Sequence, residues 1–125
     1  MKILLAEDDF ASRKFMDKQL SRYGECDVMV DGEEAVDAFM MALEDDEPYD
    51  LACLDVMMPV MDGLEATRTI RSMEREDCRT LPIIAMSANA FDDDLKKSVE
   101  CGMNGHLSKP VEVDKLYRTL AEVIR

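Results

Sequence analysis

Several short apolar runs in this sequence lead directly into polar side chains that can do chemistry. The first run, Ile3-Leu4-Leu5-Ala6, leads into three consecutive carboxylates, and later runs lead into a carboxylate, a hydroxyl and an ammonium group. These groups belong to Glu7-Asp8-Asp9, Asp55, Ser87 and Lys109. If the runs are parallel strands of one sheet, all four groups emerge at the edge where such sheets bind ligands. An acidic loop alone is usually only solvated, but four such groups at one edge predict a functional site.

The four groups together suit a divalent cation beside a phosphoryl acceptor. Converging carboxylates repel one another, and Mg²⁺ relieves that repulsion while it keeps several waters and accepts phosphate oxygens. Asp55 can then act as the nucleophile, and Lys109 and the metal neutralise charge on the transferred phosphoryl group. The Ser87 hydroxyl can donate to a phosphate oxygen, and the small Ala88 leaves room for its backbone N–H to do the same. We therefore predict Mg²⁺ as the cofactor.

The segments that must position these groups alternate between short apolar runs and longer amphipathic stretches, which is typical of repeated strand–helix units. The expected strands are Lys2 to Ala6, Cys26 to Val30, Leu51 to Leu54, Pro82 to Met86 and Gly105 to Ser108. The expected helices are Ala11 to Tyr23, Glu33 to Leu43, Leu64 to Glu76, Asp92 to Cys101 and Val113 to Ile124. Asp31 is placed to cap the second helix. Gly24 and Gly102 stand where glycines often end helices.

The expected strands differ in polarity, which predicts their places in the sheet. The first, third and fourth are apolar throughout and belong in the middle of a parallel sheet that is covered on both faces. The second contains Asp27 and the fifth contains His106, so both suit an edge. The order 2-1-3-4-5 satisfies these placements and the right-handed crossover rule. The expected fold is α/β, a doubly wound, flavodoxin-like parallel sheet of five strands.

Composition narrows the function classes. A length of 125 residues predicts one domain, residues 1–125, with a single core. Fifteen Lys and Arg against 28 Asp and Glu give a net charge of −13, which disfavours nucleic acid and anionic membrane surfaces as partners. The first apolar run is too short for a signal peptide. Four widely spaced cysteines predict free thiols in a reducing cytoplasm rather than a zinc site.

Four sequence motifs together resemble the receiver domains of two-component response regulators. They are Ile-Leu-Leu-Ala-Glu-Asp-Asp from residue 3, Asp-Val-Met-Met-Pro-Val-Met-Asp-Gly from residue 55, Pro-Ile-Ile-Ala-Met-Ser-Ala-Asn-Ala from residue 82, and Gly-Met-Asn-Gly-His-Leu-Ser-Lys-Pro from residue 102. The resemblance runs from the first strand to the last helix. It implies a signalling switch that takes a phosphoryl group on an aspartate with Mg²⁺.

Carried over residue by residue, the resemblance makes Asp55 the phosphoryl acceptor, and Ser87 and Lys109 the phosphate and switch contacts. It makes Met57 a metal ligand through its backbone carbonyl. Glu7 and Asp8 match the acidic pair of the family, so Asp8 is the expected direct metal ligand and Glu7 the ligand through water. Asp9 falls one place beyond that pair and is expected to be a loop or capping residue.

Further details also follow from the resemblance. Met57 and Asn89 are expected to flank the phosphoryl group, and the Lys109–Pro110 bond is predicted to be cis. His106 stands where the family usually has Tyr or Phe. Two interpretations of His106 stay open. In the first, its ring turns inward when Ser87 moves toward the phosphoryl group, and the coupling between these two movements is weaker than in the family or depends on pH. In the second, it is a partly exposed edge histidine without a switching role.

The implied phosphodonor is a sensor histidine kinase or a histidine phosphotransfer protein, and the implied output partner is an effector protein. We expect the signal to leave through the face of segments Asp92–Cys101, Gly105–Ser108 and Val113–Ile124, or by relay of the phosphoryl group, because the sequence ends at Arg125. The motifs look more like hybrid-kinase and phosphorelay receivers than chemotaxis regulators. The expected protein is cytoplasmic, monomeric when unphosphorylated, and no enzyme beyond its own phosphorylation and dephosphorylation.

Two other classes use related features. A flavodoxin-like FMN binder shares the fold but needs a phosphate loop rich in Ser, Thr and Gly after the first strand, where this chain has Glu7-Asp8-Asp9. A phosphatase of the haloacid-dehalogenase type shares an aspartyl nucleophile and Mg²⁺, but it needs a second Asp where this chain has Met57. Visible absorbance would favour the first class, and turnover of simple phosphomonoesters the second.

Overall fold

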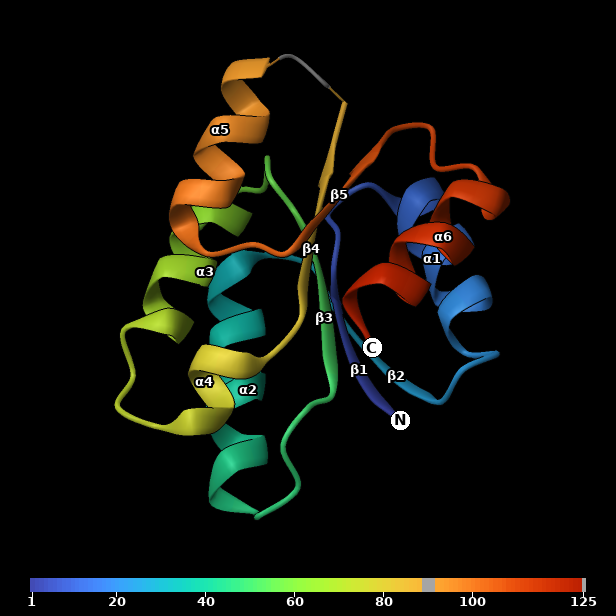
Figure 1. Cartoon of the computed structure of the whole chain (residues 1–125). Coiled ribbons are helices and arrows are strands. Elements are labelled where there is room, and N and C mark those ends of the chain that lie inside the picture. Colours follow the sequence, from blue (N-terminus) through green and yellow to red (C-terminus); the bar gives the residue numbers. More distant parts are fainter. Residues whose placement is uncertain (89–91, 125) are drawn as a thin grey trace.

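The computed structural model describes residues 1–88 and 92–124, and a parallel sheet of five strands forms its centre (Figure 1). The strands are β1 (Lys2–Ala6), β2 (Glu25–Met29), β3 (Leu51–Asp55), β4 (Ile83–Ser87) and β5 (Gly105–Ser108). Their order is β2-β1-β3-β4-β5, as predicted. Every residue of β3 and β4 is buried, whereas the residues of β2 are exposed or half-buried. The expected assignment of central and edge strands is therefore confirmed.

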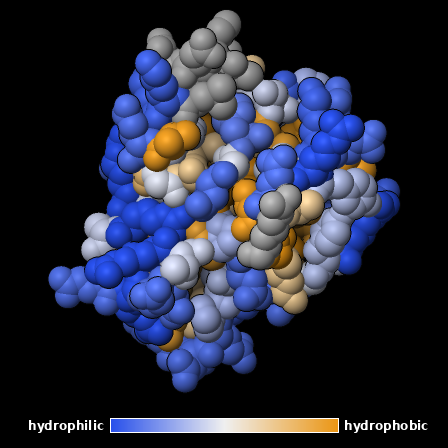
Figure 2. Space-filling model, in the orientation of Figure 1, coloured by the Kyte–Doolittle hydropathy of each residue, from blue (hydrophilic) through white to orange (hydrophobic). Residues whose placement is uncertain are grey.

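Helices cover both faces of the sheet. They are α1 (Phe10–Leu20), α2 (Gly32–Glu44), α3 (Gly63–Arg71), α4 (Glu76–Thr80), α5 (Asp92–Cys101) and α6 (Val113–Val123). Helices α1 and α6 lie on one face, and α2 to α5 lie on the other (Figure 1). Alternate strand residues feed two cores: Leu4 and Leu54 pack with Phe39 of α2, whereas Ile3 and Leu5 pack with the α1 and α6 side chains. The face of the molecule seen in Figure 2 is mostly hydrophilic.

The third expected helix, Leu64 to Glu76, is wrong in its length, because the chain forms two helices there. Helix α3 ends at Arg71, and the Ser72 hydroxyl donates to the carbonyl of Thr69. A separate short helix, α4, then brings Cys78 into the α2–α3 core, where it is fully buried. The sequence analysis expected neither the end of α3 at Arg71 nor helix α4, which lies almost entirely beyond the expected helix end at Glu76.

Strand and helix ends also differ from the expectations by a few residues. Strand β2 begins one residue earlier than expected, and β4 begins after Pro82. Strands β3 and β4 extend through Asp55 and Ser87, which therefore lie within the ladder, paired in register with Met86 and Ser108. Being the last residues of their strands, these two side chains are fixed by sheet pairing rather than by loops.

The capping expectations are confirmed at Asp31 and Gly102 and wrong at Gly24. The Asp31 side chain accepts a hydrogen bond from the backbone N–H of Glu34 at 2.8 Å. Gly102 has φ 101° and follows α5, as a helix-ending glycine should. Gly24 has no positive φ, and its lack of a side chain instead permits close approach to the backbone of Met1, since a Cβ would collide with the Met1 carbonyl.

Candidate metal centre

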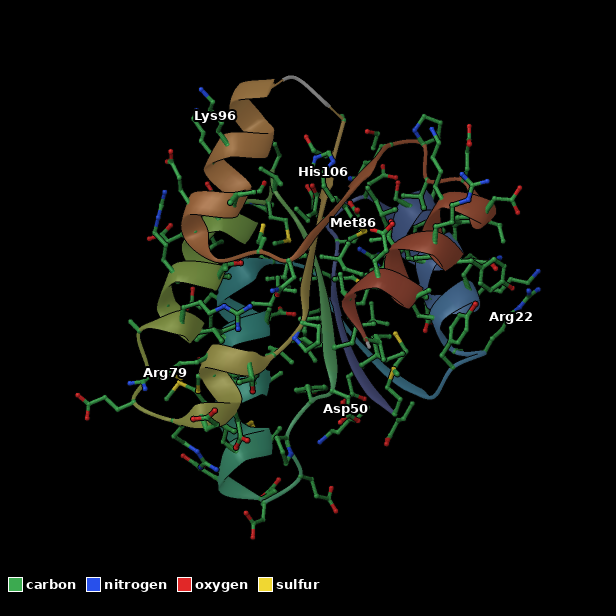
Figure 3. The ribbon with its side chains drawn as sticks, viewed as in Figure 1. Arg22, Asp50, Arg79, Met86, Lys96 and His106 are labelled. Atoms are coloured by element: carbon green, nitrogen blue, oxygen red, sulfur yellow. The ribbon has the colours of Figure 1, made fainter. Side chains whose placement is uncertain are left out.

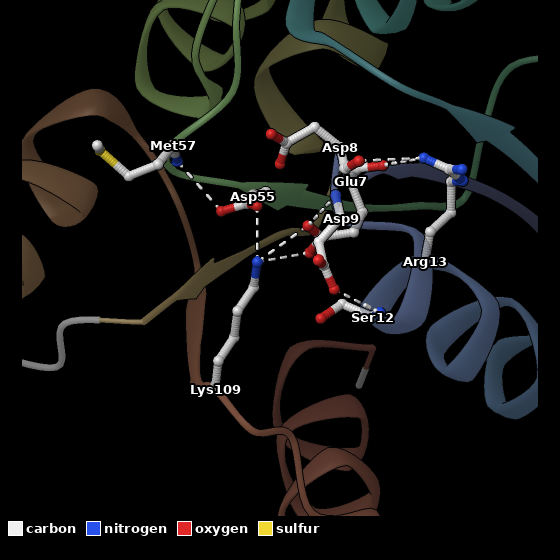
Figure 4. A network of polar contacts seen from close by, with 8 residues as sticks. All are labelled: Glu7, Asp8, Asp9, Ser12, Arg13, Asp55, Met57 and Lys109. Atoms are coloured by element: carbon white, nitrogen blue, oxygen red, sulfur yellow. Dashed lines mark hydrogen bonds and ion pairs between the residues drawn. The ribbon is translucent and has the colours of Figure 1, made fainter.

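Three carboxylates meet at the carboxyl end of the sheet. The side chains of Glu7, Asp8 and Asp55 each offer an oxygen, and these oxygens all lie within 4.8 Å of one another. Glu7 and Asp55 are 0% and 2% exposed, whereas Asp8 is open to solvent. Strands β1 and β3 are neighbours in the sheet, so their carboxyl ends bring the residues together (Figure 4). An all-oxygen donor set, open on one side, fits a hard cation such as Mg²⁺.

Lys109 reaches back over this cluster. Its Nζ lies 2.7 Å from Asp55 Oδ2, 2.9 Å from Glu7 Oε1 and 2.8 Å from Glu7 Oε2, with hydrogen-bond geometry to the first two oxygens (Figure 4). The backbone N–H of Lys109 donates to the carbonyl of Ser87 at 2.8 Å, which ties the chain after β5 to the end of β4. The Lys109–Pro110 bond is cis, as predicted. One ammonium therefore forms ion pairs with two buried carboxylates.

Burial and charge set the protonation of this cluster. Burial, followed by a hydrogen bond to Asp55, raises the pKa of Glu7 to about 7 despite the nearby Lys109. Burial of Lys109 disfavours its ammonium, but the hydrogen bonds to Asp55 and Glu7 outweigh that effect and raise the pKa of Lys109 above its ordinary value. Around neutral pH and without a bound metal ion, the Lys109 side chain is therefore charged and the Glu7 carboxyl is partly protonated.

The expectation that Asp9 is a capping residue is confirmed. Its side chain accepts a hydrogen bond from the backbone N–H of Ser12 at 2.9 Å and so caps α1. That bond lowers the pKa of the fully exposed Asp9 carboxyl. The Asp9 backbone N–H donates to Glu7 Oε1 at 3.1 Å. Asp9 thus starts α1 and orients Glu7, while its own carboxylate stays outside the three-carboxylate cluster.

The other predicted site residues lie on or just after β3, β4 and β5. The backbone N–H of Met57 donates to Asp55 Oδ1 at 3.1 Å, and Met57 is 70% exposed. Ser87 is buried at the end of β4, next to β3, and Ala88 is exposed. His106 is half-buried on the edge strand β5, in register with Ala85 (Figure 3). Asn89 lies outside the described residues.

The sequence analysis assigned no role to Arg13, whereas the structure gives it a contact in the site. Its Nη1 donates to the backbone carbonyls of Glu7 and Asp8 at 3.2 and 3.3 Å (Figure 4). An arginine one turn into α1 thereby holds the loop that carries both acidic residues. The signal in the sequence was the position of Arg13, five residues after Asp8. That spacing does not reveal the contact, because backbone carbonyls are present at every residue.

Gly63 is a second residue that the site requires. It opens α3, and a Cβ there would collide with the backbone carbonyl of Asp55. Asp62 caps this helix by accepting from the backbone N–H of Glu65 at 2.8 Å. The first turn of α3 therefore packs directly against the backbone of the candidate acceptor.

The comparisons with known proteins agree with this geometry. The family described as "Response regulator receiver domain" matches residues 3–121. The osmosensing histidine protein kinase SLN1 of Saccharomyces cerevisiae is 37% identical over 98% of this chain, and Histidine kinase 3 of Arabidopsis thaliana is 33% identical over 96%. The chain spans only 10% and 13% of the length of these two kinases.

Two solved structures are similar over nearly the whole chain. The receiver domain of sensor histidine kinase PA1611 from Pseudomonas aeruginosa, solved with magnesium in its active site cleft, has a TM-score of 0.81 and 33% identity, covering 98% of this chain and 96% of that one. The receiver domain of the histidine kinase CKI1 from Arabidopsis thaliana, solved with Mg²⁺ and BeF₃⁻, has a TM-score of 0.83 and 29% identity, covering 98% and 88%. The chain belongs to the response regulator receiver domain family, a family of signalling domains.

Membership of this family sets aside the two alternative classes, the FMN binder and the haloacid-dehalogenase phosphatase. Among the described residues, no helix is both long enough and apolar enough to span a bilayer.

Proposed function

We propose that Asp55 accepts a phosphoryl group from a phosphohistidine and that its phosphorylation switches the protein between signalling states. The observation that carries the proposal is a buried carboxylate, Asp55, that sits in a cluster of three carboxylates and receives the Lys109 ammonium at 2.7 Å. In the reaction an Asp55 oxygen forms a bond to phosphorus while the bond between phosphorus and the donor histidine nitrogen breaks. The histidine leaves with the electron pair of that bond.

The side chains of Glu7, Asp8 and Asp55, with the backbone carbonyl of Met57, would hold Mg²⁺ in this proposal. When bound, the ion neutralises charge on the phosphoryl oxygens and on the carboxylates. The clustering of three carboxylates, two of which pair with one ammonium, supports this assignment, because the described site carries more negative charge than Lys109 balances. Asp8, the exposed member, is the ligand nearest to solvent and so to an entering ion.

The chain's own groups orient and stabilise the phosphoryl group. The Met57 N–H and the Lys109 ammonium hold the two Asp55 oxygens in fixed directions, which prepares the carboxylate for in-line attack. The Lys109 ammonium then also donates a hydrogen bond to a phosphoryl oxygen and neutralises part of its charge. The Ser87 hydroxyl and the Ala88 N–H bind further oxygens, and their movement toward the phosphoryl group transmits its presence to α5 and β5.

The proposed partners are a sensor histidine kinase or a histidine phosphotransfer protein as donor, and an effector protein or a second phosphotransfer protein as recipient. The likeness to receivers within histidine kinases supports a relay role. The proposed output face is formed by α5, β5 and α6. We propose a cytoplasmic protein that is monomeric when unphosphorylated and that catalyses nothing beyond its own phosphorylation and dephosphorylation.

Acetyl phosphate labelling tests the proposal. With Mg²⁺, the intact protein should gain the mass of one phosphoryl group, and EDTA should prevent the gain. Asp55→Asn should abolish labelling, whereas Asp9→Asn, which alters a neighbouring carboxylate that only caps α1, should label like the parent. Full labelling of Asp55→Asn would contradict the assignment.

A further inference from the structure

Arg71, the last residue of α3, binds an unusual set of partners. Its guanidinium makes five hydrogen bonds, to the backbone carbonyls of Cys78, Leu81 and Gly102 and to the side chain of Asn104, at 2.7 to 3.1 Å. Every partner is a carbonyl oxygen, and no carboxylate of the described part of the chain lies within 4 Å of this cation. The side chain thus connects α3 to the end of α4, the end of α5 and the turn before β5.

The end of α5 is built to receive this arginine. The backbone N–H groups of Gly102 and Met103 donate to the carbonyls of Val99 and Ser98 at 3.0 Å each, the pairing that closes a helix around a left-handed glycine. The carbonyl of Gly102 is left to accept from Arg71 Nε and Nη2. A Cβ on Gly102 would lie 3.1 Å from Arg71 Cγ, so the guanidinium stem also packs against the glycine.

Asn104 extends the same contact into the sheet. Its side-chain oxygen accepts from Arg71 Nη2 at 2.9 Å and from the backbone N–H of Ile83 at 2.9 Å, and its own backbone N–H donates to the carbonyl of Ile83 at 2.7 Å. Arg71 therefore holds the C-terminal end of α5 to the beginning of β4. Ser87 lies at the opposite end of β4.

Helix α3 links this contact to the acceptor. Its first residue, Gly63, packs against the backbone carbonyl of Asp55, and its last, Arg71, holds the end of α5. Between them, Ala66, Thr67 and Ile70 are fully buried, which fixes the helix against the core. One short rigid helix therefore joins the backbone at Asp55 to the end of α5.

We propose that Arg71 is the fixed pivot of α5, so that phosphorylation of Asp55 displaces the N-terminal end of α5 and leaves its C-terminal end in place. This inference rests on the proposed function and concerns how that site is coupled to the output face. Arg71 acts as a positioning residue: it touches neither the acceptor nor the metal ligands.

Hydrogen exchange with beryllofluoride, a stable mimic of the phosphoryl group, tests the pivot in the full chain. In the parent protein, Mg²⁺ and beryllofluoride should change amide exchange in residues 96–97, while the amides of Gly102, Met103 and Asn104 change less than about twofold. In Arg71→Lys, which keeps the charge but loses the planar fork, beryllofluoride should change exchange of those three amides by at least about tenfold.

Two control variants distinguish the loss of the Arg71 contacts from a general loss of stability. Ile70→Val removes one buried methylene from the same helix, lowers stability, and should keep the parent's confined response. Arg68→Gln changes an exposed cation of α3 and should behave like the parent. All variants should still be labelled by acetyl phosphate.

Three results would overturn the pivot: a parent response that includes Gly102 to Asn104, an Arg71→Lys response as confined as the parent's, or an Ile70→Val response that spreads as far as that of Arg71→Lys. If the parent is labelled normally, these results refute the pivot alone. A parent that gives neither labelling nor any beryllofluoride response would overturn the proposed function and the pivot with it.

Discussion

The raised pKa of Glu7 predicts that Mg²⁺ affinity depends on pH in a defined window. A cation and a proton compete for this buried carboxyl, so binding at low pH must first release the proton. With a pKa of about 7, the apparent affinity is reduced by the factor 1 + 10^(pKa − pH). That factor is roughly 11 at about pH 6 and close to 1 at about pH 8. We therefore expect Mg²⁺ to bind about tenfold more tightly at the higher pH.

Isothermal titration calorimetry measures both the affinity and the protons released. At about pH 6, titrations in buffers of different ionisation enthalpy should show about one proton released per ion bound, and at about pH 8 almost none. Glu7→Gln should bind Mg²⁺ with an affinity that is nearly constant across this range, because the titrating carboxyl is gone. The reasoning would be refuted if the parent bound Mg²⁺ equally tightly at both pH values. It would also be refuted if the affinity of Glu7→Gln changed with pH as much as that of the parent.

Four other outcomes are expected. Because the folded protein holds the Glu7 proton up to about pH 7 and the unfolded chain releases it near 4.5, unfolding of the metal-free protein in urea should show stability falling as pH rises through that window, and Glu7→Gln should not show this fall. Asp8→Asn should weaken Mg²⁺ binding, followed by calorimetry, by at least about tenfold. Phe39→Ala, in the α2 core, should cost about 3–5 kcal/mol of unfolding free energy, whereas the half-exposed Met40→Ala should cost less than about 1 kcal/mol. A Met57→Asn, Asn89→Glu double variant should release phosphate faster than the parent, because the Met57 thioether offers no hydrogen bond to an attacking water; an equal or slower rate would show that lifetime is set elsewhere.

The sheet and its functional edge were predictable because both depend on apolar runs. A continuous run such as Ile3–Ala6 has few structural alternatives when it is short and followed by polar residues. Once the parallel order is known, the meeting of Glu7, Asp55 and Lys109 follows from the topology. The end of α3 at Arg71 and the short helix α4 were missed, because the ends of helices leave weaker sequence signals than continuous apolar runs do.

The sequence analysis also missed two residues whose side chains bind backbone carbonyls. Arg13 and Arg71 are partly buried, and their hydrogen-bond partners are mainly backbone carbonyls, which every residue carries and no sequence pattern marks. By sequence alone, each arginine resembles any exposed cation on a helix. Only the positions of the carbonyls at the ends of β1, α4 and α5 reveal what they hold.

The central claim is that Asp55 itself carries the phosphoryl group, and borohydride trapping tests it most directly. Borohydride reduces an aspartyl phosphate to homoserine, which peptide mass spectrometry locates within the sequence. After treatment with acetyl phosphate and Mg²⁺, we expect homoserine at position 55 and unmodified carboxylates at Glu7 and Asp8. Homoserine absent from position 55, or a reduced carboxylate at either neighbour, would contradict the account.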